Sequence, residues 1–152
     1  MNPTREDLEI MALTVWAEAR GESVKGQRAV AWVIRNRFEN PGWWSRNTGD
    51  GIPDDTITAV CKDPYQFSCW NPSDPNRARL DNPKTKERTD YQAILALCDD
   101  VLRADPASDP SRGADHYCTS SVVRHTKWAR GRTPVIVIGA HHFYRIGNGV
   151  TL

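Results

Sequence analysis

Two helices and the corner between them are encoded by residues 4–38, TREDLEIMALTVWAEARGESVKGQRAVAWVIRNRF. Thr4 and Asp7 are spaced as in a capping box, so we expect the first helix to begin there. Apolar residues lie on nearly every side of this helix, which predicts that it is buried. We expect the helix to stop at Gly21 as a left-handed cap, and the second helix to be capped near Ser23. The stretch therefore predicts a helical hairpin with a tight corner at residues 20–22.

The remaining chain divides into a loop-rich part, a helix and a few short strands. Six of the ten prolines lie between Pro41 and Pro83, where only one short helix, around residues 57–61, is expected. A long loop region in a compact domain often forms the wall of a binding site. A further helix is predicted over residues 86–102. Strands follow at 114–119, 134–138 and 141–146, with a turn at Gly139 and Ala140. The pattern predicts a helix-dominated α+β fold with a small C-terminal antiparallel sheet.

Length and composition narrow the class of protein. The 152 residues suit one domain spanning residues 1–152, and the net charge of +1 argues against a nucleic-acid binder. No apolar run approaches the roughly 20 residues that span a bilayer. The N-terminal residues lack the pattern of a secretory signal, so we expect synthesis in the cytosol. The cysteines form no CxxC pair and are expected to be reduced and packed, although Cys61 and Cys69 are close enough in sequence to bridge in an oxidising compartment.

Glu18 is the carboxylate best placed for acid catalysis. It lies in the last turn of an apolar helix, where burial and the negative end of the helix dipole both raise a carboxyl pKa. A carboxylic acid that stays protonated near neutral pH can give its proton to the leaving oxygen of a glycosidic bond. The alternative is a structural ion pair with Arg20, Arg28 or Arg35. Glu22 is either a second carboxylate across the same cleft or a charge that favours the start of the second helix.

Two further groups of residues suggest a site. The segment Tyr65-Gln66-Phe67-Ser68, with Trp43, Trp44 and Trp70 nearby in sequence, offers flat rings and polar groups that suit a sugar groove, although aromatic residues are equally common in cores. A second cluster could suggest zinc: Asp115, His116, Cys118, His141 and His142. No HExxH-type pair is present, and consecutive strand residues point to opposite faces, so neither a metal nor a cofactor is expected.

Four blocks of sequence, taken together, resemble the cell-wall hydrolase family typified by the catalytic domain of the spore cortex-lytic enzyme. The first block is Ala17 to Glu22, followed by Gly26-Gln27 and residues 33–37. The others are residues 56–60 leading into 66–68, then residues 113–117, and finally residues 138–144. Their order and their spread over nearly the whole chain make the resemblance specific.

The resemblance implies a lysozyme-like α+β fold and a single catalytic domain that cleaves peptidoglycan glycan strands. The bond is the β-1,4 linkage between N-acetylmuramic acid and N-acetylglucosamine, and Glu18 takes the role of catalytic acid/base. Family members that act as lytic transglycosylases release 1,6-anhydro-muramyl products. The groove residues implied are Glu22, Gln66, Phe67, Ser68, His116 and Tyr117. We expect a monomer without a membrane segment or cofactor, resembling a phage endolysin that reaches the cell wall after release.

Three other functions stay open from the sequence. A hydrolytic muramidase would need a second carboxylate, with Glu22 first and Asp54, Asp55 and Asp63 behind it. A zinc-dependent amidase or peptidase would cut the stem peptide instead of the glycan. A non-catalytic wall-binding module would bind peptidoglycan without turnover.

Overall fold

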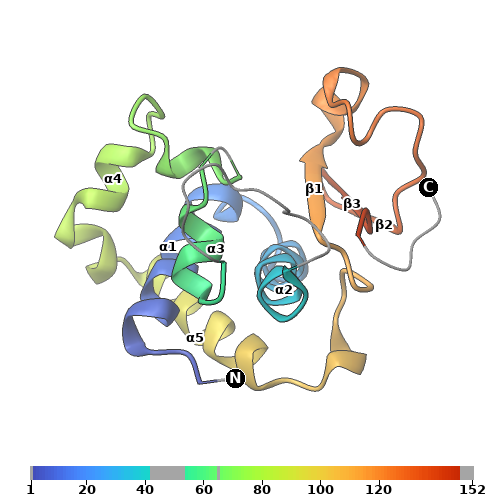
Figure 1. Cartoon of the computed structure of the whole chain (residues 1–152). Helices are drawn as coiled ribbons and strands as arrows, with labels where there is room; N and C mark the ends of the chain where they lie inside the picture. The colour runs from blue at the N-terminus through green and yellow to red at the C-terminus, as the bar shows by residue number, and fades with distance from the viewer. Residues whose placement is uncertain (1, 42–53, 65, 148–152) are drawn as a thin grey trace.

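Helices make up most of the protein, and three short strands pack at one side (Figure 1). The computed structural model describes residues 2–41, 54–64 and 66–147. The α-helices are α1 (Arg5–Ala19), α2 (Val24–Glu39), α3 (Ile57–Lys62), α4 (Arg77–Asp81) and α5 (Thr89–Arg103). Short 3-10 helices are η2 (Ser68–Trp70), η3 (Pro83–Glu87), η4 (Pro106–Ser108) and η5 (Ser120–His125). The strands are β1 (His116–Thr119), β2 (Ile136–Ile138) and β3 (His141–Tyr144).

The predicted hairpin is present, but its corner is built differently. The capping box is confirmed: Asp7 N–H donates to Thr4 Oγ1 at 3.1 Å and Thr4 N–H donates to Asp7 Oδ2 at 2.9 Å. The left-handed cap at Gly21 is wrong, because only Gly113, Gly131 and Gly139 have positive φ among the described glycines. The chain turns instead through a hydrogen bond from Glu22 N–H to the Ala19 carbonyl at 2.9 Å. Ser23 then caps α2, as predicted.

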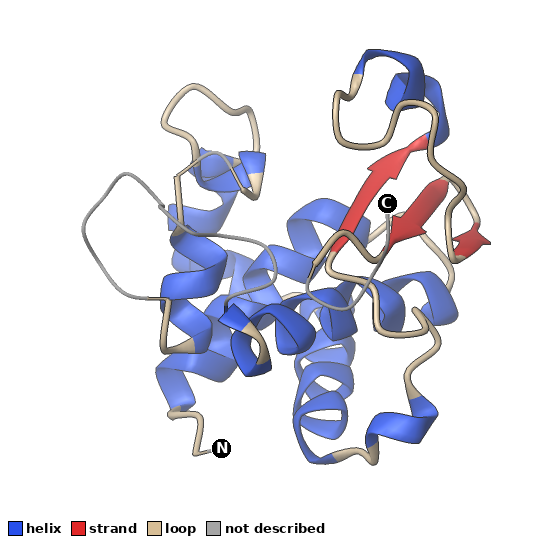
Figure 2. Ribbon diagram, turned by 45° about the vertical axis from the view of Figure 1, so that its right-hand side comes forward, coloured by secondary structure: helices blue, strands red, loops and turns tan. Residues whose placement is uncertain are grey.

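The core forms around α1, which packs against α2, α3 and α5. Its side chains are apolar on nearly all sides, and Met11 and Val15 are completely buried, as the sequence predicted. The strands form an antiparallel sheet in the order β1-β3-β2, with Tyr117 opposite Phe143. Figure 2 shows the sheet on one side of the helices.

Three consecutive polar residues of α2 fasten this helix to the end of α5 and to the segment that leads into β1. Arg35 donates to the carbonyls at the end of α5, Val101 at 2.8 Å and Ala104 at 2.6 Å. Asn36 donates to the Ala114 carbonyl at 2.9 Å, and Arg37 Nε donates to the Asp115 carbonyl at 2.6 Å. Helix α2 therefore lies between the other helices and β1, where Figure 1 shows it end-on.

The loop-rich part holds more helix than the sequence predicted. The short helix around 57–61 is confirmed as α3, but α4 and η2 are additional. The predicted helix at 86–102 begins at Thr89 instead, because residues 83–87 form the tighter η3 with Pro83 at its start. The strands lie within the predicted ranges and are shorter. Within the described residues, no helix is both long and apolar enough to cross a membrane.

Candidate active site

A cavity of about 470 Å³ lies between the end of α1 and the sheet. The helix wall consists of Glu18 from α1 with Gln66 and Ser68 from the segment before and within η2. The sheet wall consists of residues from β1, β3 and the connection after β1. The full lining is Glu18, Arg37, Gln66, Ser68, His116, Tyr117, Cys118, Thr119, Val122, Trp128 and His141.

Glu18 is half-buried at the end of α1. Burial raises the pKa of its carboxyl, and the negative charge of Asp74 adds to that rise. Hydrogen bonds from the backbone and the thiol of Cys69 act in the opposite direction but do not cancel the effect. Glu18 is therefore an acid that keeps its proton to higher pH than an exposed glutamate, which is the property that general acid catalysis needs.

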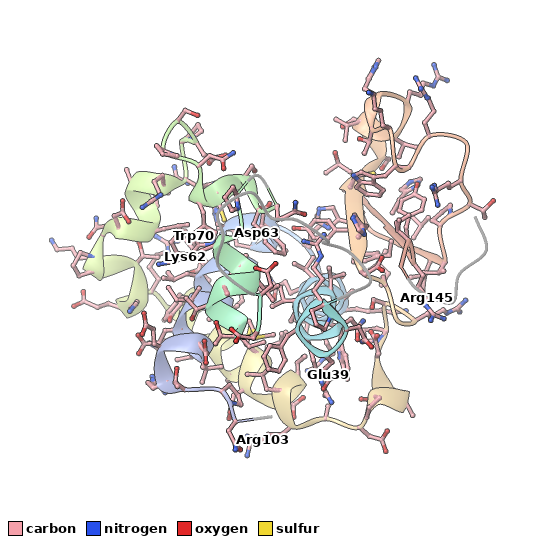
Figure 3. The ribbon with its side chains drawn as sticks, viewed as in Figure 1. Glu39, Lys62, Asp63, Trp70, Arg103 and Arg145 are labelled. Carbon is pink, nitrogen blue, oxygen red and sulfur yellow. The ribbon has the colours of Figure 1, made fainter. Side chains whose placement is uncertain are left out.

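The position of Cys69 beside Glu18 follows from how η2 is fixed. Trp70 Nε1 donates to Thr14 Oγ1 at 2.9 Å, and Thr14 lies one helical turn before Glu18 on the same face of α1. Lys62, the last residue of α3, places its Nζ 5.0 Å from the centre of the Trp70 ring, and Figure 3 shows the two residues close to one another. Tryptophan and threonine thus hold η2 against α1, and Cys69 comes to the carboxylate as a result.

The sheet wall presents neutral aromatic groups to the cavity. Burial raises the pKa of Tyr117 well above its usual value, and the charge of Glu18 adds to the rise. The rings of Tyr117 and His141 lie 4.9 Å apart between centroids. Burial also lowers the pKa of His141, so both groups are uncharged near neutral pH.

His116 is held by a buried carboxylate. Its Nδ1 lies 3.0 Å from Oδ1 of Asp115, and Asp115 also accepts hydrogen bonds from the backbone of Ile146 and Gly147, each at 2.8 Å. Burial alone would raise the pKa of Asp115, but these hydrogen bonds prevail and lower it. Burial lowers the pKa of His116. A neutral His116 therefore carries its proton on Nδ1, which leaves Nε2 as an acceptor.

Arg37 brings one buried positive charge to the site, and the sequence did not single it out as a site residue. Its Nη1 donates to Gln66 Oε1 at 3.4 Å, and its guanidinium lies 5.2 Å from the centre of the Phe67 ring. Burial lowers the pKa of Arg37 to about 10, so it stays charged at neutral pH. Together with its bond to the Asp115 carbonyl, this side chain connects the helix wall to the sheet wall.

Two predicted groove residues do not line the cavity. Phe67 is only 2% exposed and packs behind it, 6.5 Å from Tyr117 between ring centroids. Glu22 Oε1 accepts a hydrogen bond from Ala140 N–H at 3.1 Å and lies 3.9 Å from His141 Nδ1. Glu22 therefore braces the turn between β2 and β3, and it reaches the cavity only through His141.

The other predicted residues come together, and several unpredicted ones join them. Glu18, Gln66, Ser68, His116 and Tyr117 all line the same cavity although they are far apart in sequence. Thr119, Val122 and Trp128 were missed. The Trp128 ring packs against the His116 ring at a tilt of 57°, with centroids 4.8 Å apart, and no sequence pattern predicts this contact. Tyr65, Trp43 and Trp44 lie outside the described residues.

The carboxylates and possible metal ligands are placed as follows. Glu18 is the one carboxylate in the cavity lining formed by the described residues; Asp54, Asp55 and Asp63 do not contribute to it. In the part of the chain that the structure describes, no three histidine, cysteine or carboxylate side chains gather closely enough to hold a metal ion. The site therefore presents a single acid surrounded by neutral hydrogen-bonding groups and one arginine.

Comparison with known proteins gives a consistent picture. A family model described as Cell Wall Hydrolase matches residues 21–144, and Glu18 lies just before the matched region. The spore cortex-lytic enzyme of Halalkalibacterium halodurans is 31% identical over 139 residues, which cover 90% of this chain and 34% of that protein. The spore cortex-lytic enzyme of Bacillus subtilis is 27% identical over 140 residues, covering 92% of this chain and 38% of that protein. The chain thus spans between a third and two fifths of the length of these relatives.

The fold also matches a solved structure. The catalytic domain of the Bacillus cereus SleB protein superposes with a TM-score of 0.61, covering 94% of this chain and 92% of that one, at 22% sequence identity. This similarity confirms the helix-dominated, lysozyme-like α+β fold that the sequence predicted.

Proposed function

The chain belongs to the cell wall hydrolase family, and on that premise we propose that it cleaves the β-1,4 bond between N-acetylmuramic acid and N-acetylglucosamine in peptidoglycan. The observation that carries the proposal is the half-buried Glu18, with its raised pKa, in a cavity of saccharide size. The relatives named as spore cortex-lytic enzymes support a wall polymer as the substrate.

We further propose that the reaction is that of a lytic transglycosylase. Glu18 donates its proton to the glycosidic oxygen as the bond to C1 of the muramic acid breaks. The Glu18 carboxylate then takes the proton of the C6 hydroxyl of the same sugar, and that oxygen bonds to C1. The acid is restored, no water is consumed, and a 1,6-anhydro product leaves.

The absence of a second carboxylate from the described cavity lining supports this reaction over hydrolysis. Hydrolytic glycosidases use two carboxyl groups about 5 to 9.5 Å apart, one of them to activate water or to attack the sugar. The other lining groups suit sugar binding instead. We assign the hydrogen bonds to sugar hydroxyls to Gln66, Ser68, His116 and Tyr117, and contact with a pyranose face to the Trp128 ring.

Product analysis tests the proposal. Purified peptidoglycan digested by the wild-type protein should give muropeptides that are one water molecule lighter than those from a hydrolytic muramidase, as measured by mass spectrometry. Reducing-end muramic acid among the products would establish the muramidase instead. Intact glycan strands with cut stem peptides, and activity lost with EDTA, would establish a zinc amidase or peptidase. Binding without any product would establish a wall-binding module. Release from the producing cell, as for a phage endolysin, stays a prediction of the sequence.

A further inference from the structure

A second cavity, of about 530 Å³, lies against the other side of the last turn of α1. Trp16 and Arg20 are four residues apart and share one face of the helix, whereas Glu18 lies between them in sequence and faces the active cavity. The opposite side of the second cavity comes from α4 and η3. Its lining is Trp16, Arg20, Arg79, Asn82, Lys84, Thr85 and Arg88.

The lining is strongly cationic, with four positive side chains. Arg88 is engaged by Asp90, with Nε to Oδ1 at 3.0 Å and Nη2 to Oδ2 at 3.1 Å. For the charged ends of Arg79 and Lys84 the structure records neither a hydrogen bond nor an ion pair with any described residue. Both are exposed, so their guanidinium and ammonium groups are available to a ligand.

Arg20 and Trp16 form the fixed floor of this cavity. The Arg20 guanidinium lies 4.4 Å from the centre of the Trp16 ring, and its Nη1 donates to the Trp16 carbonyl at 3.3 Å and the Ala17 carbonyl at 3.2 Å. Burial lowers the pKa of Arg20, and the nearby charge of Arg79 lowers it further. Like charges held together in this way repel one another, and an anion bound among them relieves the repulsion.

The two cavities are joined by a short chain of contacts. Arg20 Nη2 donates to Asn76 Oδ1 at 3.1 Å, and Asn76 N–H donates to Asp74 Oδ1 at 2.8 Å. Asp74 is the carboxylate whose charge raises the pKa of Glu18. The turn that holds Asp74 and Asn76 therefore links Glu18 in the wall of the active cavity to Arg20 in the wall of the cationic cavity.

We propose that the cationic cavity binds the carboxylates of the stem peptide that a peptidoglycan strand carries on its muramic acid. This inference rests on the proposed function, because it assigns the strand to the active cavity. A stem of four residues reaches about 13 Å when extended, slightly more than the roughly 10–12 Å diameter of an α-helix with its side chains. Planar guanidinium groups pair well with carboxylates, and the pair of Arg79 and Lys84 supplies the charges that are not already engaged.

The first test compares two substrates: glycan strands with their stem peptides, and the same strands after the peptides have been removed. For the wild type we expect kcat/KM to be about ten-fold higher on the peptide-bearing strands, the gain of roughly one charge-assisted hydrogen bond. In the double variant Arg79→Gln/Lys84→Gln this preference should fall to about two-fold or less. The control Lys25→Gln/Arg130→Gln removes one lysine and one arginine from exposed positions outside both cavities, and it should keep the full preference. A preference that persists in Arg79→Gln/Lys84→Gln would overturn the inference.

The second test measures binding without turnover, so that it stands apart from the proposed function. The stem tetrapeptide alone is titrated into the labelled protein, and we expect the Trp16 indole N–H resonance to shift in the wild type and not in Arg79→Gln/Lys84→Gln. Turnover of glycan without such a shift would overturn the stem-peptide site and leave the proposed function standing. A shift without turnover of glycan would overturn the proposed function and leave the stem-peptide site standing. An equal shift with inorganic phosphate at the same concentration would show a general anion site and overturn the assignment to the stem peptide.

Discussion

The two walls of the active cavity are held by different means. On the helix wall, Glu18 is positioned by its own helix and by η2, which is joined to the same helix through Trp70 and Thr14. On the sheet wall, His116 is positioned by Asp115, which in turn depends on residues far along the chain. The reacting group is thus carried by a long buried helix that η2 braces from outside, whereas His116 on the sheet wall is held by a buried carboxylate that accepts three hydrogen bonds.

The largest expected effect comes from the helix wall. Glu18→Gln keeps the shape of the side chain but removes the transferable proton, so we expect turnover on peptidoglycan to fall by about 10²- to 10⁴-fold. Stability should be unchanged or higher, because a half-buried acid becomes a neutral amide.

The matched control is Glu22→Gln, which makes the same chemical change outside the cavity. Its amide oxygen can still accept the hydrogen bond from Ala140. We expect Glu22→Gln to keep at least about one tenth of the wild-type rate, because the loss of a general acid would lower the rate by far more than ten-fold. A folded Glu22→Gln variant as inactive as Glu18→Gln would mean that a pair of carboxylates does the chemistry, as in a hydrolytic muramidase.

The next effect concerns the sheet wall and is measured as stability. Asp115 is completely buried and accepts three hydrogen bonds, and in Asp115→Asn the amide N–H₂ must face at least one of these donors. We expect the free energy of unfolding in urea to fall by about 2–4 kcal/mol. Asp105→Asn is the control, because asparagine replaces aspartate well as a cap, and it should change stability by less than about 0.5 kcal/mol.

The difference in the free energy of unfolding between wild type and Asp115→Asn should also depend on pH. The pKa of Asp115 is lower in the folded protein than the usual value of 3.8, so its contribution is fully present above that value. It is lost as the pH falls through the folded-state pKa. Urea unfolding of both proteins at neutral pH and at acidic pH checks this, and a gap that widens on acidification would contradict the hydrogen-bonding role of Asp115.

A smaller effect on stability is expected from replacing glycine by alanine at two positions, one beside each wall of the cavity. Gly139 has φ of +56°, and a Cβ there would lie 2.7 Å from Glu22 Oε1, so Gly139→Ala must strain the turn and displace Glu22. We expect a loss of about 1–2 kcal/mol of stability in thermal or urea unfolding. A Cβ at Gly21 would meet no atom within 4 Å beyond its chain neighbours, and the φ of Gly21 is not positive, so Gly21→Ala should be neutral or stabilising by up to about 1 kcal/mol. Equal losses at both sites would show that the corner at Gly21 needs glycine after all.

The same contrast explains how much the sequence could predict. Helical periodicity and capping residues are local signals, so the sequence could predict the α1–α2 hairpin and the position of Glu18 in the last turn of α1. The predicted left-handed cap at Gly21 was wrong because glycine can adopt a positive φ but does not have to. The chain turns at this corner through the hydrogen bond from Glu22 N–H to the Ala19 carbonyl instead. Arg37 on α2 and Trp128 on the sheet wall gain their places through contacts with residues twelve or more positions away in sequence, for which no local pattern exists. The family resemblance assigned Phe67 to the groove, but in the folded protein Phe67 is buried behind the cavity wall.

The smallest expected effect tests how the helix wall tunes its acid. The Cys69 thiol donates a hydrogen bond to the Glu18 carboxylate and so lowers a pKa that burial raises. Cys69→Ala removes that donor while the backbone N–H of residue 69 remains, so the pKa of Glu18 should rise. Because the general acid must be protonated, the rate falls above its pKa, and the alkaline limb of the pH–rate profile should therefore move to higher pH in Cys69→Ala. Cys98→Ala truncates another buried cysteine, in α5 and outside the cavity lining, and it should cost similar stability while leaving the limb in place. If both variants shift the limb equally, loosened packing moves it and the thiol hydrogen bond does not tune Glu18. A shift confined to Cys69→Ala would locate the control of the acid in η2, on the same wall that carries the reaction.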